Sequence, residues 1–160
     1  KMPDSTILLR IFIAGEVRSS KNSQRLVPGK KGKARMIQSE AAEAYVNFTA
    51  HQWKQNAKAF REAAKDLPRP LTVGFLWVRG TKQTYDQTGP LEMVLDCMTG
   101  KKFKAIDKAM PGFAKSASWI NDDTREEICP LLYKNHVYDP QNPGVHIFLY
   151  TDHPIETPQV

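Results

Sequence analysis

Three carboxylate side chains stand close together in the sequence, where a predicted strand gives way to a predicted helix. Asp86 follows an apolar run, and Glu92 and Asp96 come next, four residues apart. Residues at this spacing lie on one face of a helix. Carboxylate oxygens are the ligands that Mg²⁺ and Mn²⁺ prefer, so the three acids form a candidate metal site. The alternative is a solvated helix face at Glu92 and Asp96 and a turn residue at Asp86.

The elements that must position these acids follow from the pattern of apolar residues. Leu71–Arg79 is apolar on both faces, as is typical of a central strand that is covered on both sides. Pro90 suits the first helical position because it has no N–H to leave unsatisfied, and Gly100 suits the end of a helix. The sequence therefore predicts a strand that leads to the first acid and a helix that carries the other two. Lys82, in the polar link after the strand, would place a cation beside them.

A second acidic pair, Asp122 and Asp123, follows Trp119-Ile120-Asn121 later in the chain. Basic residues lie between the predicted helix and this pair: Lys101, Lys102 and Lys104. Because Phe103 and Phe113 are interleaved with them, the stretch suits contact with the backbone and bases of a nucleic acid. An ordinary amphipathic helix hinge is the alternative interpretation.

The longest predicted element is a helix. Ser39 can cap it, apolar residues recur three and four positions apart, and Pro68 ends it. Tyr45 and Trp53 lie at this spacing, which favours a place in the core; a platform on which bases stack is the alternative. The four histidines have no second ligand at a fixed local spacing, so none is assigned to a metal.

Three further strands are expected. Aliphatic residues alternate at period two over 6–17, and two short apolar runs follow over 128–133 and 145–150. The ends, 1–5 and 151–160, carry no pattern and should be loosely ordered.

The segment from Arg18 to Arg35 is basic throughout. It contains seven cationic residues and no acid: Arg18, Lys21, Arg25, Lys30, Lys31, Lys33 and Arg35. Pro28-Gly29 and Gly32 exclude a regular helix, so we expect a flexible loop. Like charges without a compensating acid repel one another unless an anion is bound, which favours contact with phosphates. A solubilising surface loop is the alternative.

Composition narrows the class of protein. A chain of 160 residues, 41% of them hydrophobic, suffices for one domain with a real core. The formal charge of +6 suggests an anionic partner without distinguishing nucleic acid from a membrane surface. Cys97 and Cys129 have no partner at metal-ligand spacing, so we expect reduced, packed thiols. No apolar run is long enough to span a bilayer and the first residues show no signal-peptide pattern, so we expect a cytoplasmic protein.

Five short motifs follow one another along nearly the whole chain. They are Ser19-Ser20-Lys21-Asn22-Ser23, Tyr85-Asp86, Leu95-Asp96, Trp119-Ile120-Asn121-Asp122-Asp123 and Tyr138-Asp139-Pro140-Gln141-Asn142-Pro143-Gly144-Val145. In this order they resemble the RusA-type Holliday junction resolvases, in the divergent form found in phages and prophages. Each motif is weak alone, and the specificity of the match comes from their order.

The resemblance implies a single compact α/β domain over residues 1–160, with a small mixed β-sheet packed against helices. It also implies a crossover junction endodeoxyribonuclease that acts as a homodimer in the cytoplasm of a bacterial host, in DNA recombination and repair. Such an enzyme binds four-way DNA junctions and cuts two strands symmetrically with Mg²⁺ or Mn²⁺ held by aspartates. The basic residues of 18–35, with Asn22 among them, would then contact DNA.

The site residues of the family carry over one position at a time. The family motif Asp-x-Asp-Asn-x-x-Lys would begin at Asp86, and Asp122 aligns with a later catalytic aspartate. Three positions depart from the motif, where its second aspartate, its asparagine and its lysine would stand: Thr88, Gly89 and Glu92. Lys82 is a candidate for the missing cation, since a cation near the scissile phosphate stabilises developing charge.

We expect Asp86 and Asp122 to bind the metal directly. One or more of three further acids would complete or orient the ligand shell and point into the same cavity: Asp96, Glu92 or Asp123. The metal would generate hydroxide and neutralise charge on the phosphate.

Two other functions stay open, and so does the dimer contact. A catalytically impaired RusA-like protein that binds DNA junctions is suggested by the three replaced positions. A basic accessory protein that binds the acidic surface of another protein is the third possibility. The dimer contact is expected at the first strand, Ile7 to Ile13, or at an apolar edge of Leu71–Arg79.

Overall fold

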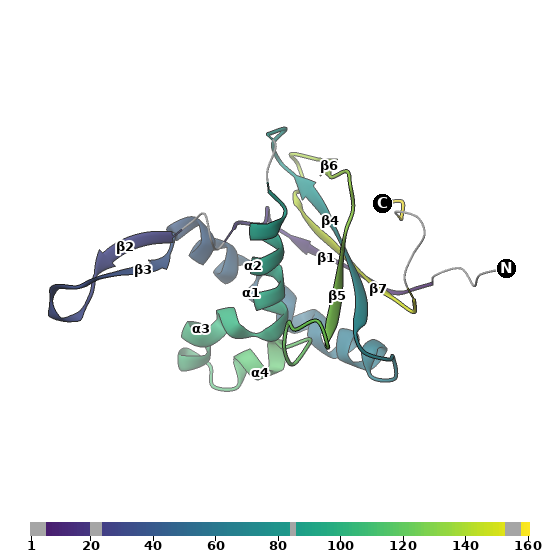
Figure 1. Cartoon of the computed structure of the whole chain (residues 1–160), viewed down its shortest axis with the longest axis horizontal. Coiled ribbons are helices and arrows are strands. Elements are labelled where there is room, and N and C mark those ends of the chain that lie inside the picture. The colour runs from purple at the N-terminus through teal and green to yellow at the C-terminus, as the bar shows by residue number, and fades with distance from the viewer. Residues whose placement is uncertain (1–5, 20–23, 84–85, 153–157) are drawn as a thin grey trace.

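A mixed β-sheet with helices packed on one face forms the body of the protein (Figure 1). The structure, a computed structural model, describes residues 6–19, 24–83, 86–152 and 158–160, and for 24–27 and 35–38 only the backbone. The strands of the main sheet are β1 (Ile7–Ala14), β4 (Leu71–Arg79), β5 (Ile128–Leu132), β6 (Val137–Tyr138) and β7 (Gly144–Tyr150). The prediction of a single compact α/β domain, with a mixed sheet packed against helices, is confirmed.

β4 lies in the middle of this sheet. The strand order is β1-β7-β4-β5, and β6 pairs with the end of β4. β7 runs antiparallel to its two neighbours, whereas β5 and β6 run parallel to β4. Every residue of β4 except Thr72 is buried. The central strand is therefore confirmed. β4 pairs with β7 on one side and with β5 and β6 on the other, so it is not an edge strand.

The long predicted helix is α1 (Glu40–Ala64). Ser39 caps it, since its hydroxyl accepts a hydrogen bond from the Ala42 N–H at 3.2 Å. Tyr45 and Trp53 are 4% and 0% exposed. Trp53 Nε1 donates to Thr49 Oγ1 at 3.0 Å, so even the polar edge of the indole is satisfied inside the helix layer. The core interpretation of both aromatic residues is confirmed.

The helix that carries two of the acids is α2 (Thr88–Thr99). It begins before the predicted Pro90 because the Asp86 carboxylate accepts the Thr88 N–H at 2.9 Å and opens the first turn. It ends at Gly100, which has φ +83° and where a Cβ would lie 2.7 Å from the Ala114 carbonyl oxygen. Three short helices follow: η2 (Lys101–Phe103), α3 (Lys104–Ala109) and α4 (Phe113–Ala117).

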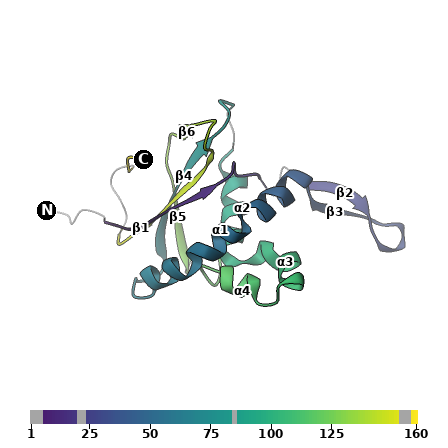
Figure 2. The same ribbon diagram turned by 180° about the vertical axis from the view of Figure 1, so that it is seen from behind.

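The basic segment contains a β-hairpin, so the expectation of a flexible loop is wrong. β2 (Gln24–Pro28) and β3 (Ala34–Gln38) pair antiparallel and are joined by a turn that contains η1 (Lys30–Gly32). They form a sheet of their own, which projects well beyond the body in Figures 1 and 2. Leu26-Val27 and Met36-Ile37 flank a glycine-containing turn, a hairpin pattern that the surrounding charges obscure.

The two cysteines have different environments. Cys97 is buried and Cys129, on the edge strand β5, is exposed; both are free thiols. The packed-thiol prediction is therefore confirmed for Cys97 and wrong for Cys129. Burial raises the pKa of the Cys97 thiol. No helix in the described part of the chain is long and apolar enough to cross a bilayer.

The ends that the sequence predicts to be loosely ordered fall mostly outside the described residues, at 1–5 and 153–157.

Candidate nucleic-acid interface and acidic cluster

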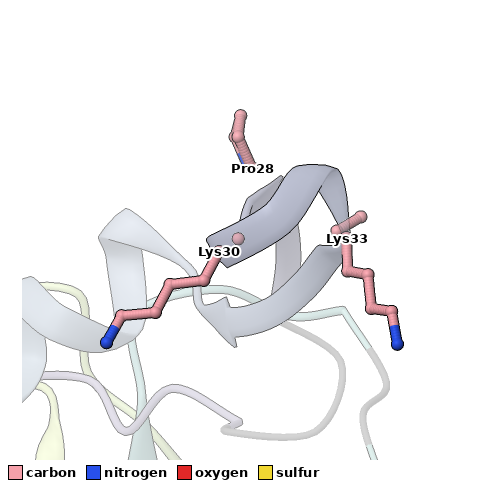
Figure 3. Close-up of a pocket in the computed structure, with 5 residues that line it drawn as sticks. Pro28, Lys30 and Lys33 are labelled. Atoms are coloured by element: carbon pink, nitrogen blue, oxygen red, sulfur yellow. The ribbon is translucent and has the colours of Figure 1, made fainter.

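The hairpin of β2 and β3, which we name the arm, presents cations at its tip. Lys30, Lys31 and Lys33 are all exposed. An open hollow of about 550 Å³ beside the turn is lined by Pro28, Gly29, Lys30, Lys33 and Ala34. Figure 3 shows Lys30 and Lys33 extending on the side away from Pro28, with their ammonium groups well apart. Cations spread in this way can reach separate phosphates.

The tip has a backbone conformation that favours glycine. Lys31 and Gly32 have φ of +59° and +73°, and the Gly29 N–H donates to the Lys33 carbonyl at 2.7 Å. A side chain in the left-handed region costs about 1 kcal/mol relative to glycine. The conformation of the turn therefore does not favour a lysine at position 31.

The other predicted DNA-binding residues of this region fall into three groups. Arg18 is exposed where the chain leaves β1. Arg25 and Arg35 belong to the backbone ladder of the arm, paired with Ile37 and Val27. Two more predicted contacts lie outside the described residues: Lys21 and Asn22.

Trp119 brings the second acidic pair next to α2. Its N–H donates to the Met98 carbonyl in the last turn of α2 at 2.7 Å, and its Nε1 donates to the Trp53 carbonyl in α1 at 2.7 Å. Its ring packs against Trp53 and Phe60, with centroids 5.1 and 4.9 Å apart. The acidic pair begins three residues after Trp119, so it lies near the C-terminal end of α2.

Lys101 bridges the two aspartates. Its Nζ lies 3.4 Å from Asp122 Oδ1 and 3.3 Å from Asp123 Oδ1. The hydrogen bond with Asp123 raises the pKa of Lys101, and the backbone N–H of Asp123 lowers the pKa of Asp122. The side chains of Lys101 and Asp122 are each 53% exposed, so water screens the pair and its contribution to stability is small.

Asp96 is coupled electrostatically to this bridge. Loss of hydration on burial raises its pKa; Lys102 and Lys101 oppose that shift, and Asp123 and Glu92 add to it. We name the residues that interact here the acid–lysine cluster: Glu92, Asp96, Lys101, Lys102, Asp122 and Asp123. Lys101 and Lys102, which the sequence predicts to contact DNA, therefore face carboxylates, and Lys104 is exposed beyond them.

Asp86 lies at the opposite end of α2 from the Lys101 bridge. α2 has 12 residues, which at 1.5 Å per residue is a length of about 18 Å. Lys82 precedes Asp86 in the loop between β4 and α2, and its Nζ lies 5.0 Å from the centroid of the Tyr138 ring. It forms no ion pair with an acid among the described residues. Among the described residues, the contacts group Asp96 with Asp122 and Asp123 at one end of α2, and Asp86 lies at its other end.

The positions that depart from the family motif lie in the first turns of α2. At Gly89 a Cβ would lie 2.1 Å from Ser19 Oγ, so an asparagine does not fit there unless Ser19 moves. Thr88 is exposed and Glu92 is half-buried. Gly89 therefore allows Ser19, in the segment after β1, to pack against the first turn of α2.

The carboxylate oxygens of these acids are suitable ligands for a divalent cation, but their arrangement is not. Carboxylate oxygens are ligands for Mg²⁺. Within the described residues, however, no group of three or more His, Cys, Asp or Glu side chains is placed to hold a metal ion. The Lys101 ammonium lies 3.4 Å from Asp122 Oδ1 and 3.3 Å from Asp123 Oδ1, so it competes with a metal ion for these oxygens. The described residues as they stand do not fit the metal, and its site stays a prediction.

One exposed aromatic residue escaped the sequence analysis. Phe48 on α1 is 65% exposed. It lies outside the apolar stripe that Tyr45, Thr49 and Trp53 follow. A phenylalanine on the polar side of an amphipathic helix is a signal that the sequence carries and that could have marked it as a binding residue.

The chain matches no protein-family model, no curated protein and no solved structure. The resemblance to the RusA-type resolvases therefore depends on the five sequence motifs alone.

Proposed function

We propose that the protein binds branched DNA, with four-way junctions as its preferred target. The observation that carries this proposal is the arm, a projecting hairpin whose tip presents Lys30, Lys31 and Lys33 to solvent. A two-stranded β-ribbon fits the major groove of B-DNA, and lysines bind its phosphates. The motifs shared with the RusA-type resolvases favour a junction over plain duplex.

Binding through the arm would depend on charge and shape. Lysine contacts to phosphates carry no sequence information, and they weaken steeply as salt is added. An isolated two-stranded hairpin is only marginally stable in water, so DNA would also order the arm. The expected signature is a high-affinity, salt-sensitive complex with little preference for sequence.

We further propose a homodimer formed through β1. β1 is an edge strand, and Gln52 already satisfies the backbone of Ala14, with hydrogen bonds of 2.7 Å from its N–H and 3.0 Å to its carbonyl. Backbone groups alternate in direction along a strand, so those of Arg10 and Phe12 face the same edge. Pairing with β1 of a second copy would cover these groups and give each junction two arms.

Metal-dependent, symmetric cleavage of the bound junction is the second candidate function. The acid–lysine cluster favours it because Asp122 and Asp123 share Lys101, and because Asp123 and Glu92 both act electrostatically on Asp96. Against it stand the position of Asp86 at the other end of α2, the bridging Lys101 and the glycine at 89. Binding therefore stands first and cleavage second.

One set of substrates tests both functions. A synthetic four-way junction and a duplex of matched length are titrated in EDTA, and the junction is then incubated with Mg²⁺ or Mn²⁺ beside the Asp122→Asn and Asp86→Asn variants. We expect tighter binding of the junction than of the duplex in EDTA. Paired nicks made by the original chain and lost in Asp122→Asn would establish cleavage. Equal affinity for both substrates would contradict the proposal, and weak binding that ignores salt would favour the accessory protein.

A further inference from the structure

Phe48 exposes most of its side chain to water, and two adjacent carbons of its ring lie against the protein. It is the most exposed large apolar side chain of the described chain, at 65%. The ring rests on the backbone of Gly15, where a Cβ would lie 3.1 Å from two of its carbons. An aromatic ring with this exposure offers apolar surface to a second flat group.

The chain around Phe48 fixes the segment of α1 that carries the ring. Gln52, one helical turn later, accepts a hydrogen bond from the Ala14 N–H at 2.7 Å and donates one to its carbonyl at 3.0 Å. These bonds hold α1 against the end of β1. Gly15 follows with φ +113°, a conformation that favours glycine, and so lets the ring approach the backbone. A surface that is positioned in advance loses little conformational entropy when a ligand binds.

An open hollow of about 350 Å³ lies beside the ring. It is lined by Gly15, Glu16, Arg18, Ala41, Ala44, Tyr45 and Phe48. The two alanines leave room next to the ring, and Arg18 supplies an exposed cation. The acid of the hollow, Glu16, is paired with Arg79 at 3.1 Å. The hollow therefore combines an aromatic wall with a positive charge.

The hollow lies on the path between the arm and the start of α2. Arg18 is followed by Ser19, whose Oγ packs over Gly89 in the first turn of α2. On the other side, α1 begins two residues after β3. Figure 2 shows the arm next to the start of α1, the helix that lines one side of the hollow. DNA held by the arm would meet this hollow as it approaches the body.

We propose that Phe48 is a stacking platform for an unstacked nucleobase at the branch point of the DNA that the arm holds, with Arg18 against the adjacent phosphate. This inference rests on the proposed function and names the part of the branched substrate that is recognised. Every base has a π-face that stacks on an aromatic ring, and exposing a base costs least where it is already unpaired or unstacked. The platform thus distinguishes branched DNA from plain duplex.

A protein ligand is the other occupant that an exposed aromatic residue can indicate. The charge beside the ring argues against it here. The arm tip carries three exposed lysines, Arg18 is exposed, and the acid of the hollow is neutralised. These features complement a polyanion, and the flat ring complements its bases.

The test uses a four-way junction that carries 2-aminopurine, a fluorescent adenine analogue sensitive to stacking, next to the branch point, together with a duplex that carries it internally. Three variants are compared with the original chain: Phe48→Ala, Phe48→Leu and Phe48→Trp. Leucine is the matched control, since it keeps apolar bulk without a π-face. We expect Phe48→Ala and Phe48→Leu to bind the junction about tenfold more weakly and the duplex unchanged. Phe48→Trp should restore both the affinity and the fluorescence change.

The outcomes separate this inference from the proposed function. Unchanged junction affinity in Phe48→Ala and Phe48→Leu overturns the platform and leaves junction binding in place. A loss in Phe48→Ala that Phe48→Leu restores overturns stacking in favour of simple apolar contact. Equal losses on junction and duplex overturn the branch-point role. If the original chain binds neither DNA, the proposed function and the inference both fail. Thermal unfolding of each variant confirms that it folds.

Discussion

Removing the charge of the arm tip should weaken DNA binding by an amount that depends on salt. The change is Lys30→Gln, Lys31→Gln and Lys33→Gln together, and all three side chains are exposed. Each phosphate contact on duplex DNA contributes about 0.9 to the slope of log affinity against log salt, so three contacts contribute about 2.7. If the electrostatic contribution vanishes near about 1 M salt, the loss is about 500-fold at about 0.1 M and about 25-fold at about 0.3 M.

A second triple variant separates the arm from net charge. Lys58→Gln, Lys65→Gln and Lys134→Gln remove the same number of exposed positive charges, and none of these lysines belongs to the arm. Fluorescence anisotropy with a labelled junction, repeated across a salt series, measures affinity and slope for both variants. The arm variant should lose the predicted slope, and the control should stay within a few-fold of the original chain. Equal losses in both, or an unchanged slope in the arm variant, would refute phosphate contact by the arm.

Three further predictions follow from single positions. Lys31→Gly should stabilise the turn by about 1 kcal/mol, seen as slower hydrogen exchange in the arm, and yet weaken DNA binding; tighter binding would show that its charge is not used. Asp96→Asn should stabilise the fold at pH 7, because burial raises the pKa of Asp96 and the folded state therefore pays to ionise it. This gain in stability should disappear as the pH falls below 3.8, the ordinary pKa of an aspartate, because Asp96 is then protonated in both states. Urea unfolding of both proteins at several pH values measures the difference. A stability gain that grows in acid would contradict the argument. Arg10→Pro removes an N–H that faces the open edge of β1, so light scattering should find a monomer where Arg10→Ala is still a dimer; a dimer in both would place the contact elsewhere.

The sequence predicted correctly those parts of the fold where a single residue type, or a local pattern, has one clear structural explanation. Ser39 could be assigned because a hydroxyl before an apolar repeat satisfies a helix N-terminus, and Gly100 because a left-handed helix end favours glycine. The doubly apolar run of β4 predicted a central strand, since both faces of such a strand must be covered.

The arm was not predicted because two kinds of signal conflict in it. Its glycines and its proline are typical of an irregular loop, and its lysines are typical of a solvent-exposed segment. The short apolar pairs in β2 and β3 form strands only when the two segments pair with one another. Their pairing, Val27 with Arg35 and Arg25 with Ile37, is a contact between segments and has no local signature.

The acid–lysine cluster was only partly predictable for a related reason. The helical spacing placed Glu92 and Asp96 on one face of α2, but it gave no information on how far Asp86 and Asp122 lie from them. The hydrogen bond from the Trp119 N–H to the Met98 carbonyl sets that distance, because it attaches the second acidic pair to one end of the helix. Long-range hydrogen bonds of this kind depend on the whole packed core.

Hydrogen exchange of the arm, with and without a four-way junction, tests the central claim most directly. A projecting hairpin of marginal stability should exchange its amides quickly in the unbound protein. If the arm is what grips DNA, saturating junction should slow exchange in β2 and β3 more than anywhere in the main sheet. Exchange in the arm that is unchanged at saturating junction would contradict the account.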